Sequence, residues 1–180
     1  MKIYTIGHST RPFGEFLRVL RQYDIRCLVD VRRFPSSRKF PHFNRGELET
    51  SLLHHGIRYV WMEQLGGRRH GPTVPDSPNT GLRSPAFRNY ADHMQTEEFH
   101  AAIDALVTQA ENCPTAIMCA EKLHFRCHRM LISDYLTTIG IEVLHIGTSA
   151  SGTEDSPIPH TYTSCAKVEG GKLTYPGVPL

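Results

Sequence analysis

Short apolar runs alternate along this chain with stretches in which apolar residues recur at helical spacing. The apolar runs predict about five strands, at residues 3–6, 27–31, 57–61, 115–118 and 141–146. The run at 27–31 is almost entirely apolar, as is typical of a strand covered on both faces. Strands that alternate with helices predict an α/β fold, with a mainly parallel central sheet flanked by helices in a single three-layer domain.

The predicted helices begin near recognisable start signals, which are Pro12, Asn44, Pro85, Thr96 and Met130. Asn44 with Glu47 three residues later predicts an N-cap with a capping box. Each helix then shows an apolar stripe that would face the sheet.

Two segments fall outside this alternation. Residues 66–84 contain two adjacent glycines and three prolines, and both a lid and a disordered loop fit that composition. After Gly147 the chain becomes polar, and Glu169-Gly170-Gly171-Lys172 predicts a hairpin. We expect one domain over residues 1–180, with 147–180 as a C-terminal extension.

The composition favours a reduced, cytoplasmic protein with no membrane partner. The chain has 180 residues, which is enough for one domain with its own core. No apolar run approaches the roughly 20 residues that span a bilayer. The N-terminus reads as a strand and not as a signal peptide. The five cysteines are odd in number and scattered, unlike a disulfide framework.

The charge is small overall but unevenly distributed. The net charge is only +2, yet fifteen of the twenty Lys and Arg residues are Arg. Five basic residues and no acidic residue lie between Asp30 and Glu47. Arg suits bidentate contact with phosphate or carboxylate. This segment therefore indicates either an anion-binding loop or a solvated surface.

The stretch from Met118 to Arg129 is the richest in reactive side chains. It holds two thiols, a carboxylate, two imidazoles and two guanidiniums between a predicted strand and a predicted helix. In a parallel sheet this turn lies at the carboxyl edge, where ligands bind. His8 and Asp30 also follow predicted strands, so we expect them to approach the same edge.

Four residues are candidates for catalysis, namely Cys119, Glu121, Asp30 and His8. A thiol near helix N-terminal amides and Arg would have a lowered pKa, which would make Cys119 a nucleophile; a small buried side chain is the alternative. Six residues separate Cys119 from Arg126 and none is glycine, so this is not a tyrosine-phosphatase loop.

Asp30 and Glu121 could form an acid–base pair for hydrolysis or glycosyl transfer. Ion pairs are the alternative: Asp30 with Arg32 or Arg38, and Glu121 with Arg129. His8 titrates near neutrality and is a candidate base, or it caps its turn through Ser9.

The candidate ligand-binding residues combine anion-binding and thiol or imidazole side chains: Ser9, Arg32, Arg38, Arg68, Cys127, His128 and Arg129. Cys119, Cys127 and His128 are metal-type ligands, but their spacing lacks the close pairs of structural zinc sites. We therefore assign no metal ligand here, the sequence leaves any cofactor unknown, and a thiol- or metal-dependent protein stays open.

Several separate motifs resemble one family. They are Thr5-Ile6-Gly7-His8-Ser9-Thr10, Asp30-Val31-Arg32 with Ser37-Arg38, Leu65-Gly66-Gly67-Arg68, and Cys119-Ala120-Glu121 with Cys127-His128-Arg129. In this order, through about residue 146, the chain resembles domain of unknown function 488 (DUF488). The resemblance implies a compact α/β fold and no particular reaction.

Common nucleotide and hydrolase motifs are missing from the sequence, including the P-loop, the dinucleotide glycine fingerprint and the Gly-x-Ser-x-Gly elbow. The pattern favours recognition of an anion, which would be a phosphorylated small molecule or nucleic acid, with hydrolytic or transfer chemistry at the strand ends. A non-catalytic nucleotide- or nucleic-acid-binding module is the alternative.

Overall fold

A computed structural model describes residues 1–69, 74–147 and 156–177. Its centre is a six-stranded sheet in the order β3-β2-β4-β1-β5-β6. The strands are β1 (Lys2–Gly7), β2 (Cys27–Asp30), β3 (Arg58–Trp61), β4 (Thr115–Cys119), β5 (Glu142–His145) and β6 (Ile158–Pro159). Strands β1 to β5 are parallel, and only β6 pairs antiparallel. The predicted α/β fold is confirmed.

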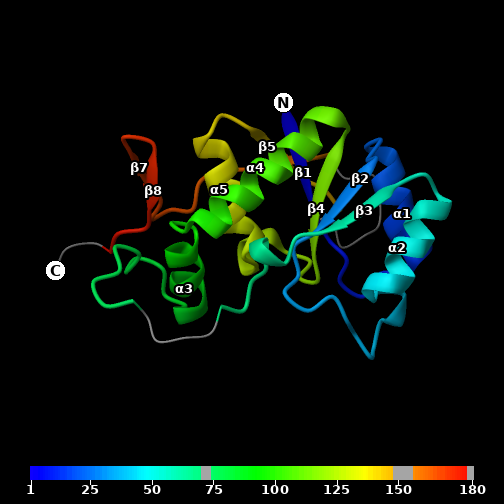
Figure 1. Ribbon diagram of the computed structural model, residues 1–180, viewed down its shortest axis with the longest axis horizontal. Coiled ribbons are helices and arrows are strands. Elements are labelled where there is room, and N and C mark those ends of the chain that lie inside the picture. Colours follow the sequence, from blue (N-terminus) through cyan, green and yellow to red (C-terminus); the bar gives the residue numbers. More distant parts are fainter. Residues whose placement is uncertain (70–73, 148–155, 178–180) are drawn as a thin grey trace.

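Helices cover both faces of this sheet (Figure 1). One face carries α1 (Phe13–Gln22) and α2 (Arg45–His54), and the other carries α3 (Pro85–His93), α4 (Glu97–Asn112) and α5 (Arg129–Thr138). Three short 3₁₀ helices, η1 (Pro41–Phe43), η2 (Glu63–Leu65) and η3 (His124–Arg126), lie in the loops. The apolar sides of the helices contribute to two buried clusters, one on each face of the sheet, and Tyr90 of α3 joins its cluster by packing against Phe99 of α4.

The strand order places three strand ends side by side. Strand β4 is inserted between β2 and β1, so that Gly7 is opposite Cys119 and Asp30 is opposite Met118. Because these strands are parallel, the turns that follow them leave from one edge of the sheet. This edge carries the predicted site.

Two of the predicted N-caps can be compared with the structure. The side chain of Thr96 accepts a hydrogen bond from the Phe99 amide at 3.2 Å, as an N-cap should. Asn44 does precede α2, but its side chain makes no capping hydrogen bond. It instead accepts from the Ser37 amide, across the loop that follows β2. The predicted capping box is therefore wrong, because the loop takes the oxygen that the helix would use.

The C-terminal extension packs into the domain. Strands β7 (Lys167–Glu169) and β8 (Lys172–Thr174) form an antiparallel hairpin, and Gly170 and Gly171 adopt the positive φ angles that its turn requires. Beyond it, Tyr175 is buried against α3 and α5, and its hydroxyl donates to Asp134 at 3.0 Å.

Part of the segment from 66 to 84 is held in place by contacts with the C-terminal extension and with α3. The Asn79 side chain is 1% exposed, accepts from the Tyr175 amide at 3.0 Å and donates to Asp92 of α3 at 2.7 Å. Residues 70–73, on which the lid and disorder interpretations partly depend, lie outside the described residues. Among the helices that the structure describes, none has the length and apolar character needed to cross a membrane.

We predict that Tyr175→Ala lowers the free energy of unfolding by about 3–5 kcal/mol, the usual cost of removing a buried aromatic ring. The matched control is Tyr162→Ala, because Tyr162 belongs to the same extension but is 42% exposed. Urea denaturation of both variants measures the difference. Equal losses for the two would show that the extension is not part of the core.

Candidate functional site

The turn after β1 is held beside the turn after β4. The amides of His8 and Ser9 donate to the carbonyls of Cys119 and Ala120, both at 2.9 Å, so the pairing continues beyond the strands. A side chain on Gly7 would overlap the carbonyl oxygen of Glu121. The sequence therefore needs glycine here to bring the two candidate segments together.

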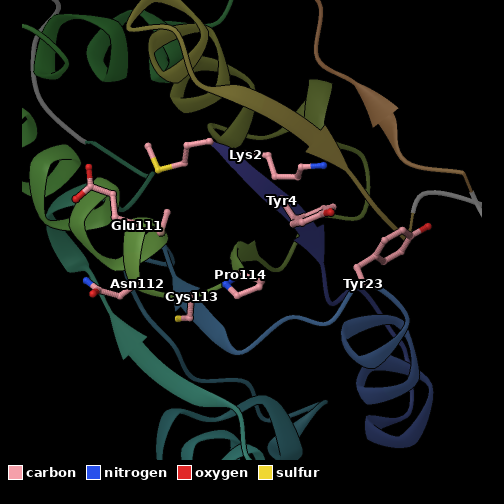
Figure 2. Close-up of a pocket in the computed structure, with 9 residues that line it drawn as sticks. Lys2, Tyr4, Tyr23, Glu111, Asn112, Cys113 and Pro114 are labelled. Atoms are coloured by element: carbon pink, nitrogen blue, oxygen red, sulfur yellow. The ribbon is translucent and has the colours of Figure 1, made fainter.

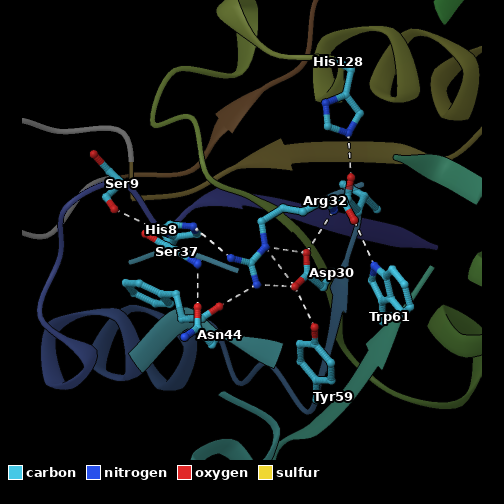
Figure 3. A network of polar contacts seen from close by, with 11 residues as sticks. His8, Ser9, Asp30, Arg32, Ser37, Asn44, Tyr59, Trp61 and His128 are labelled. Atoms are coloured by element: carbon cyan, nitrogen blue, oxygen red, sulfur yellow. Dashed lines mark hydrogen bonds and ion pairs between the residues drawn. The ribbon is translucent and has the colours of Figure 1, made fainter. Parts of the chain in front are cut away.

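A buried ion pair closes β2 (Figure 3). Asp30 is fully buried and Arg32 is 6% exposed, and the Arg32 Nε atom lies 2.9 and 3.0 Å from the two Asp30 oxygens. Arg32 Nη2 also donates to the Phe43 carbonyl at 2.8 Å, and the Tyr59 hydroxyl donates to Asp30 at 2.7 Å. This geometry supports the ion-pair interpretation of Asp30, with Arg32 as its partner and not Arg38, which is exposed.

His8 lies on this ion pair. Its ring stacks on Phe43 with 4.1 Å between centroids, Nδ1 donates to the Ser9 carbonyl at 2.9 Å, and Arg32 Nη1 lies 3.3 Å from Nε2. Burial, and then the Arg32 charge, lower the pKa of His8 to about 4. His8 is therefore neutral at pH 7, and its free electron pair accepts a hydrogen bond from Arg32.

Cys119, Cys127 and His128 form a second cluster at the end of β4. The Cys127 sulfur lies 3.4 Å from His128 Nδ1, and the Cys119 sulfur lies 4.0 Å from the same nitrogen. His128 Nε2 donates to the Val31 carbonyl at 2.8 Å (Figure 3). Because Nε2 donates to this carbonyl, Nδ1 is the ring nitrogen that faces the two thiols.

The acidic thiol of this pair is Cys127. A hydrogen bond from Cys119, with His128 and Arg129 nearby, lowers the pKa of Cys127 well below its usual value. The same hydrogen bond and burial raise the pKa of Cys119. We expected the lowered pKa at Cys119, because the sequence does not show which of two neighbouring thiols donates to the other.

Arg129 is 1% exposed and lies behind the thiols. Its guanidinium donates to Thr5 Oγ1 at 3.3 Å, to the Lys122 carbonyl at 3.3 Å and to the Glu121 carbonyl. The predicted Glu121–Arg129 ion pair is not formed, since the Glu121 carboxylate is exposed and accepts from the Leu123 amide at 3.2 Å. No carboxylate in the described part of the chain forms a salt bridge with Arg129.

A pocket of about 910 Å³ opens over both clusters. Eight of the predicted site residues line it: His8, Ser9, Arg32, Arg68, Cys119, Glu121, Cys127 and His128. Asp30 and Arg129 are buried and are not in its lining, and Arg38 lies outside it. Most of the predicted site residues therefore meet at one edge of the sheet, as the parallel strands implied. The catalytic roles of these residues stay predictions.

Three further cations line the pocket and were not assigned to the site from the sequence, namely Arg33, Lys122 and Arg126. Lys122 and Arg126 lie within the Met118–Arg129 stretch, so their position in the sequence could have identified them as site residues. Arg33 pairs with Glu63 at 3.2 Å, and only the fold shows that it reaches the rim.

A second hollow, of about 800 Å³, lies at the opposite edge of the sheet (Figure 2). It is lined by the start of β1, the end of α4 and Pro114, which precedes β4. Its charged lining residues are Lys2 and Glu111. The cationic side chains and paired thiols thus lie at the carboxyl edge.

The fold and this edge define a three-layer α/β domain with a cationic pocket over one buried and one half-buried thiol. A family model described as a domain of unknown function, DUF488, matches residues 12–136, more than half of the chain. The chain therefore belongs to the DUF488 family. The match begins after the Thr5–Thr10 motif and ends before β5, within the 1–146 core expected from the motifs. Neither the curated proteins nor the solved structures contain a match to this chain.

We predict that Asp30→Asn lowers the free energy of unfolding by about 3–5 kcal/mol, because it leaves the Arg32 charge buried without a counter-charge. Asp24→Asn is the matched control, since Asp24 and Arg26 have the same spacing but are 70% and 60% exposed. We expect the control to change stability by less than about 0.5 kcal/mol. Denaturant titration measures both, and similar small effects would contradict the prediction.

We predict that stability falls as the pH drops below about 6.5. The unfolded chain then protonates its histidines, whereas burial holds the pKa of His8 at about 4 and that of His145 at about 2. The folded state therefore binds fewer protons, and each such histidine costs about 1.4 kcal/mol per pH unit from 6.5 down to its folded pKa. His8→Asn should reduce the pH slope of the unfolding free energy between pH 6.5 and 5, and the exposed His54→Asn should not. Equal slopes would contradict it.

Proposed function

We propose that the carboxyl-edge pocket binds a phosphorylated, nucleotide-sized ligand. We also propose that the Cys119–Cys127–His128 cluster is the reactive centre for hydrolytic or transfer chemistry on that ligand. The observation that carries this proposal is the lining of one pocket by the cluster and by cationic side chains from two separate loops.

The charge of the lining supports an anionic ligand. Arg68 follows η2, and Lys122 and Arg126 lie between β4 and α5, so these three cations surround the pocket from different elements. Glu121 is the one carboxylate among the described lining residues. Because Asp30 compensates Arg32, the excess positive charge belongs to the exposed side chains that a ligand meets first.

The size and apolar lining support a nucleotide-sized ligand over a bare ion. The pocket volume of about 910 Å³ lies within the range usual for small-molecule sites. Phe34, Phe40 and Phe87 line it as well, and Phe34 is 61% exposed. Such rings are suited to stack on a base while the guanidiniums bind phosphate.

The roles that we assign follow from these positions. Cys119, Cys127 and His128 lie where a bound ligand would reach them, and the exposed Glu121 carboxylate is available for proton transfer. Asp30 and His8 hold Arg32 in place and are positioning residues in this proposal.

We predict that Arg126→Glu and Arg68→Glu each weaken the binding of a nucleoside monophosphate by at least about tenfold, or about 1.4 kcal/mol. The reason is that each reverses a charge facing the ligand. Lys172→Glu is the matched control, because it makes the same charge change on the β8 hairpin, outside the pocket lining. Calorimetric titration at low and high salt measures the affinity.

Loss of affinity with rising salt is expected for a ligand held by cations. Equal affinities for all three variants would contradict the proposed pocket, and tighter binding of a single-stranded oligonucleotide than of the mononucleotide would favour the nucleic-acid alternative. Unchanged product formation by Cys119→Ser and Glu121→Ala would contradict the catalytic assignment.

A further inference from the structure

We infer that Cys119, Cys127 and His128 bind a zinc ion whose fourth coordination position opens into the pocket. The site itself is argued from ligand geometry. Its use in chemistry rests on the proposed function of the pocket.

The three ligand atoms are already near tetrahedral positions. Zinc–sulfur and zinc–nitrogen bonds of about 2.3 and 2.0 Å place a sulfur and a nitrogen ligand about 3.5 Å apart. The Cys127 and Cys119 sulfurs lie 3.4 and 4.0 Å from His128 Nδ1, and all three ligand atoms lie within 4.8 Å of one another. A small adjustment of side chains is therefore enough to place one ion among them.

The imidazole is oriented as metal-binding histidines usually are. His128 Nε2 donates to the Val31 carbonyl at 2.8 Å, which directs Nδ1 and its electron pair to the thiols. A ligating histidine typically donates its other ring N–H to a carbonyl or carboxylate in this way. Two sulfurs and one imidazole form a ligand set that zinc prefers over magnesium or calcium.

Gly67 keeps space beside the ligating nitrogen. A Cβ atom on Gly67 would lie 2.7 Å from His128 Nδ1 and 3.0 Å from Cγ, against the face of the ring, so glycine here allows the imidazole to keep the position in which Nδ1 faces the two sulfurs. All three ligand residues and Gly67 line the pocket. Three protein ligands with an open position are typical of catalytic zinc sites, whereas structural sites are closed by four.

A second group of candidate ligands, His124, His145 and His160, carries the proposal less well. Two of its members, His145 and His160, already form a continuous chain of hydrogen bonds, from Thr5 to His145 at 2.7 Å, to His160 at 3.0 Å and to Asp134 at 2.8 Å. In this group it is His124 Nδ1 that has no hydrogen-bond partner among the described residues. Metal binding there would break these short hydrogen bonds. Thiols form weak hydrogen bonds, so an ion would replace weaker interactions at Cys119 and Cys127.

Zinc at this position gives the proposed hydrolysis its nucleophile. A zinc-bound water has a pKa near 7, so it loses one proton to solvent and attacks as hydroxide. Its oxygen forms the new bond to the electrophilic atom of the anionic ligand as the bond to the leaving group breaks. The leaving group then takes a proton from water.

The test is the zinc content of the whole protein, purified under reducing conditions without chelator. We expect about one zinc per chain, and less than about 0.2 in Cys119→Ser and in Cys127→Ser. Cys113→Ser and Cys165→Ser are the matched controls, because both residues lie outside the cluster and should retain the ion. Cobalt substitution should give thiolate-to-metal absorption that only the cluster variants lose.

A variant that keeps all three ligand residues provides a second test that does not depend on removing a cysteine. Gly67→Ala should weaken zinc binding at least about tenfold in a competition with a chelating dye, since it crowds Nδ1. Zinc-free protein that takes up no added zinc, a Cys119–Cys127 disulfide in its place, or zinc lost from His145→Asn and not from Cys127→Ser would each overturn the inference. Mononucleotide binding by a protein that takes up no zinc would overturn the inference while leaving the proposed pocket intact, and zinc binding without nucleotide affinity would do the reverse.

Discussion

The pairing of Asp30 with Arg32 is the interaction on which the floor of the pocket depends. It compensates a buried guanidinium that also contacts His8 after β1 and the Phe43 carbonyl in η1, while Tyr59 of β3 donates to the same carboxylate. This one ion pair thus connects the turn after β1, the η1 helix and strand β3. Removing either partner would leave a buried charge, which makes this arrangement hard to vary.

The ion pair also bears on the thiol cluster through the backbone. Val31 lies between Asp30 and Arg32, and its carbonyl accepts the hydrogen bond that orients His128. The conformation that the ion pair imposes on the end of β2 therefore sets which ring nitrogen faces the cysteines. In this way, the ion pair at the end of β2 is linked through the Val31 carbonyl to the side chain of His128, beside the end of β4.

Local sequence patterns predicted the helices and strands well. Features that depend on contacts between distant parts of the chain could not be predicted in the same way. The strand runs, the Thr96 cap and the Gly170-Gly171 turn depend on neighbouring residues, so they were visible in the sequence. The insertion of β4 between β2 and β1 depends on packing across the whole sheet, so it was not visible in the sequence. For the same reason the sequence spacing of Cys119 and Cys127 concealed how close their thiols lie to His128, and it left open the Glu121–Arg129 ion pair, which is not formed between side chains.

The two buried arginines of the site are compensated differently, and this difference explains the polarity of the pocket. Arg32 has the Asp30 carboxylate, whereas the contacts of Arg129 in the described chain are carbonyls and the Thr5 hydroxyl. Dipoles solvate a guanidinium but do not cancel its charge, so Arg129 leaves a positive potential beneath Cys119 and Cys127. That potential favours thiolate over thiol. It acts in the same direction as the exposed Arg68 and Arg126 and the half-buried Lys122, so the buried and the more accessible cations all favour negative charge in the pocket.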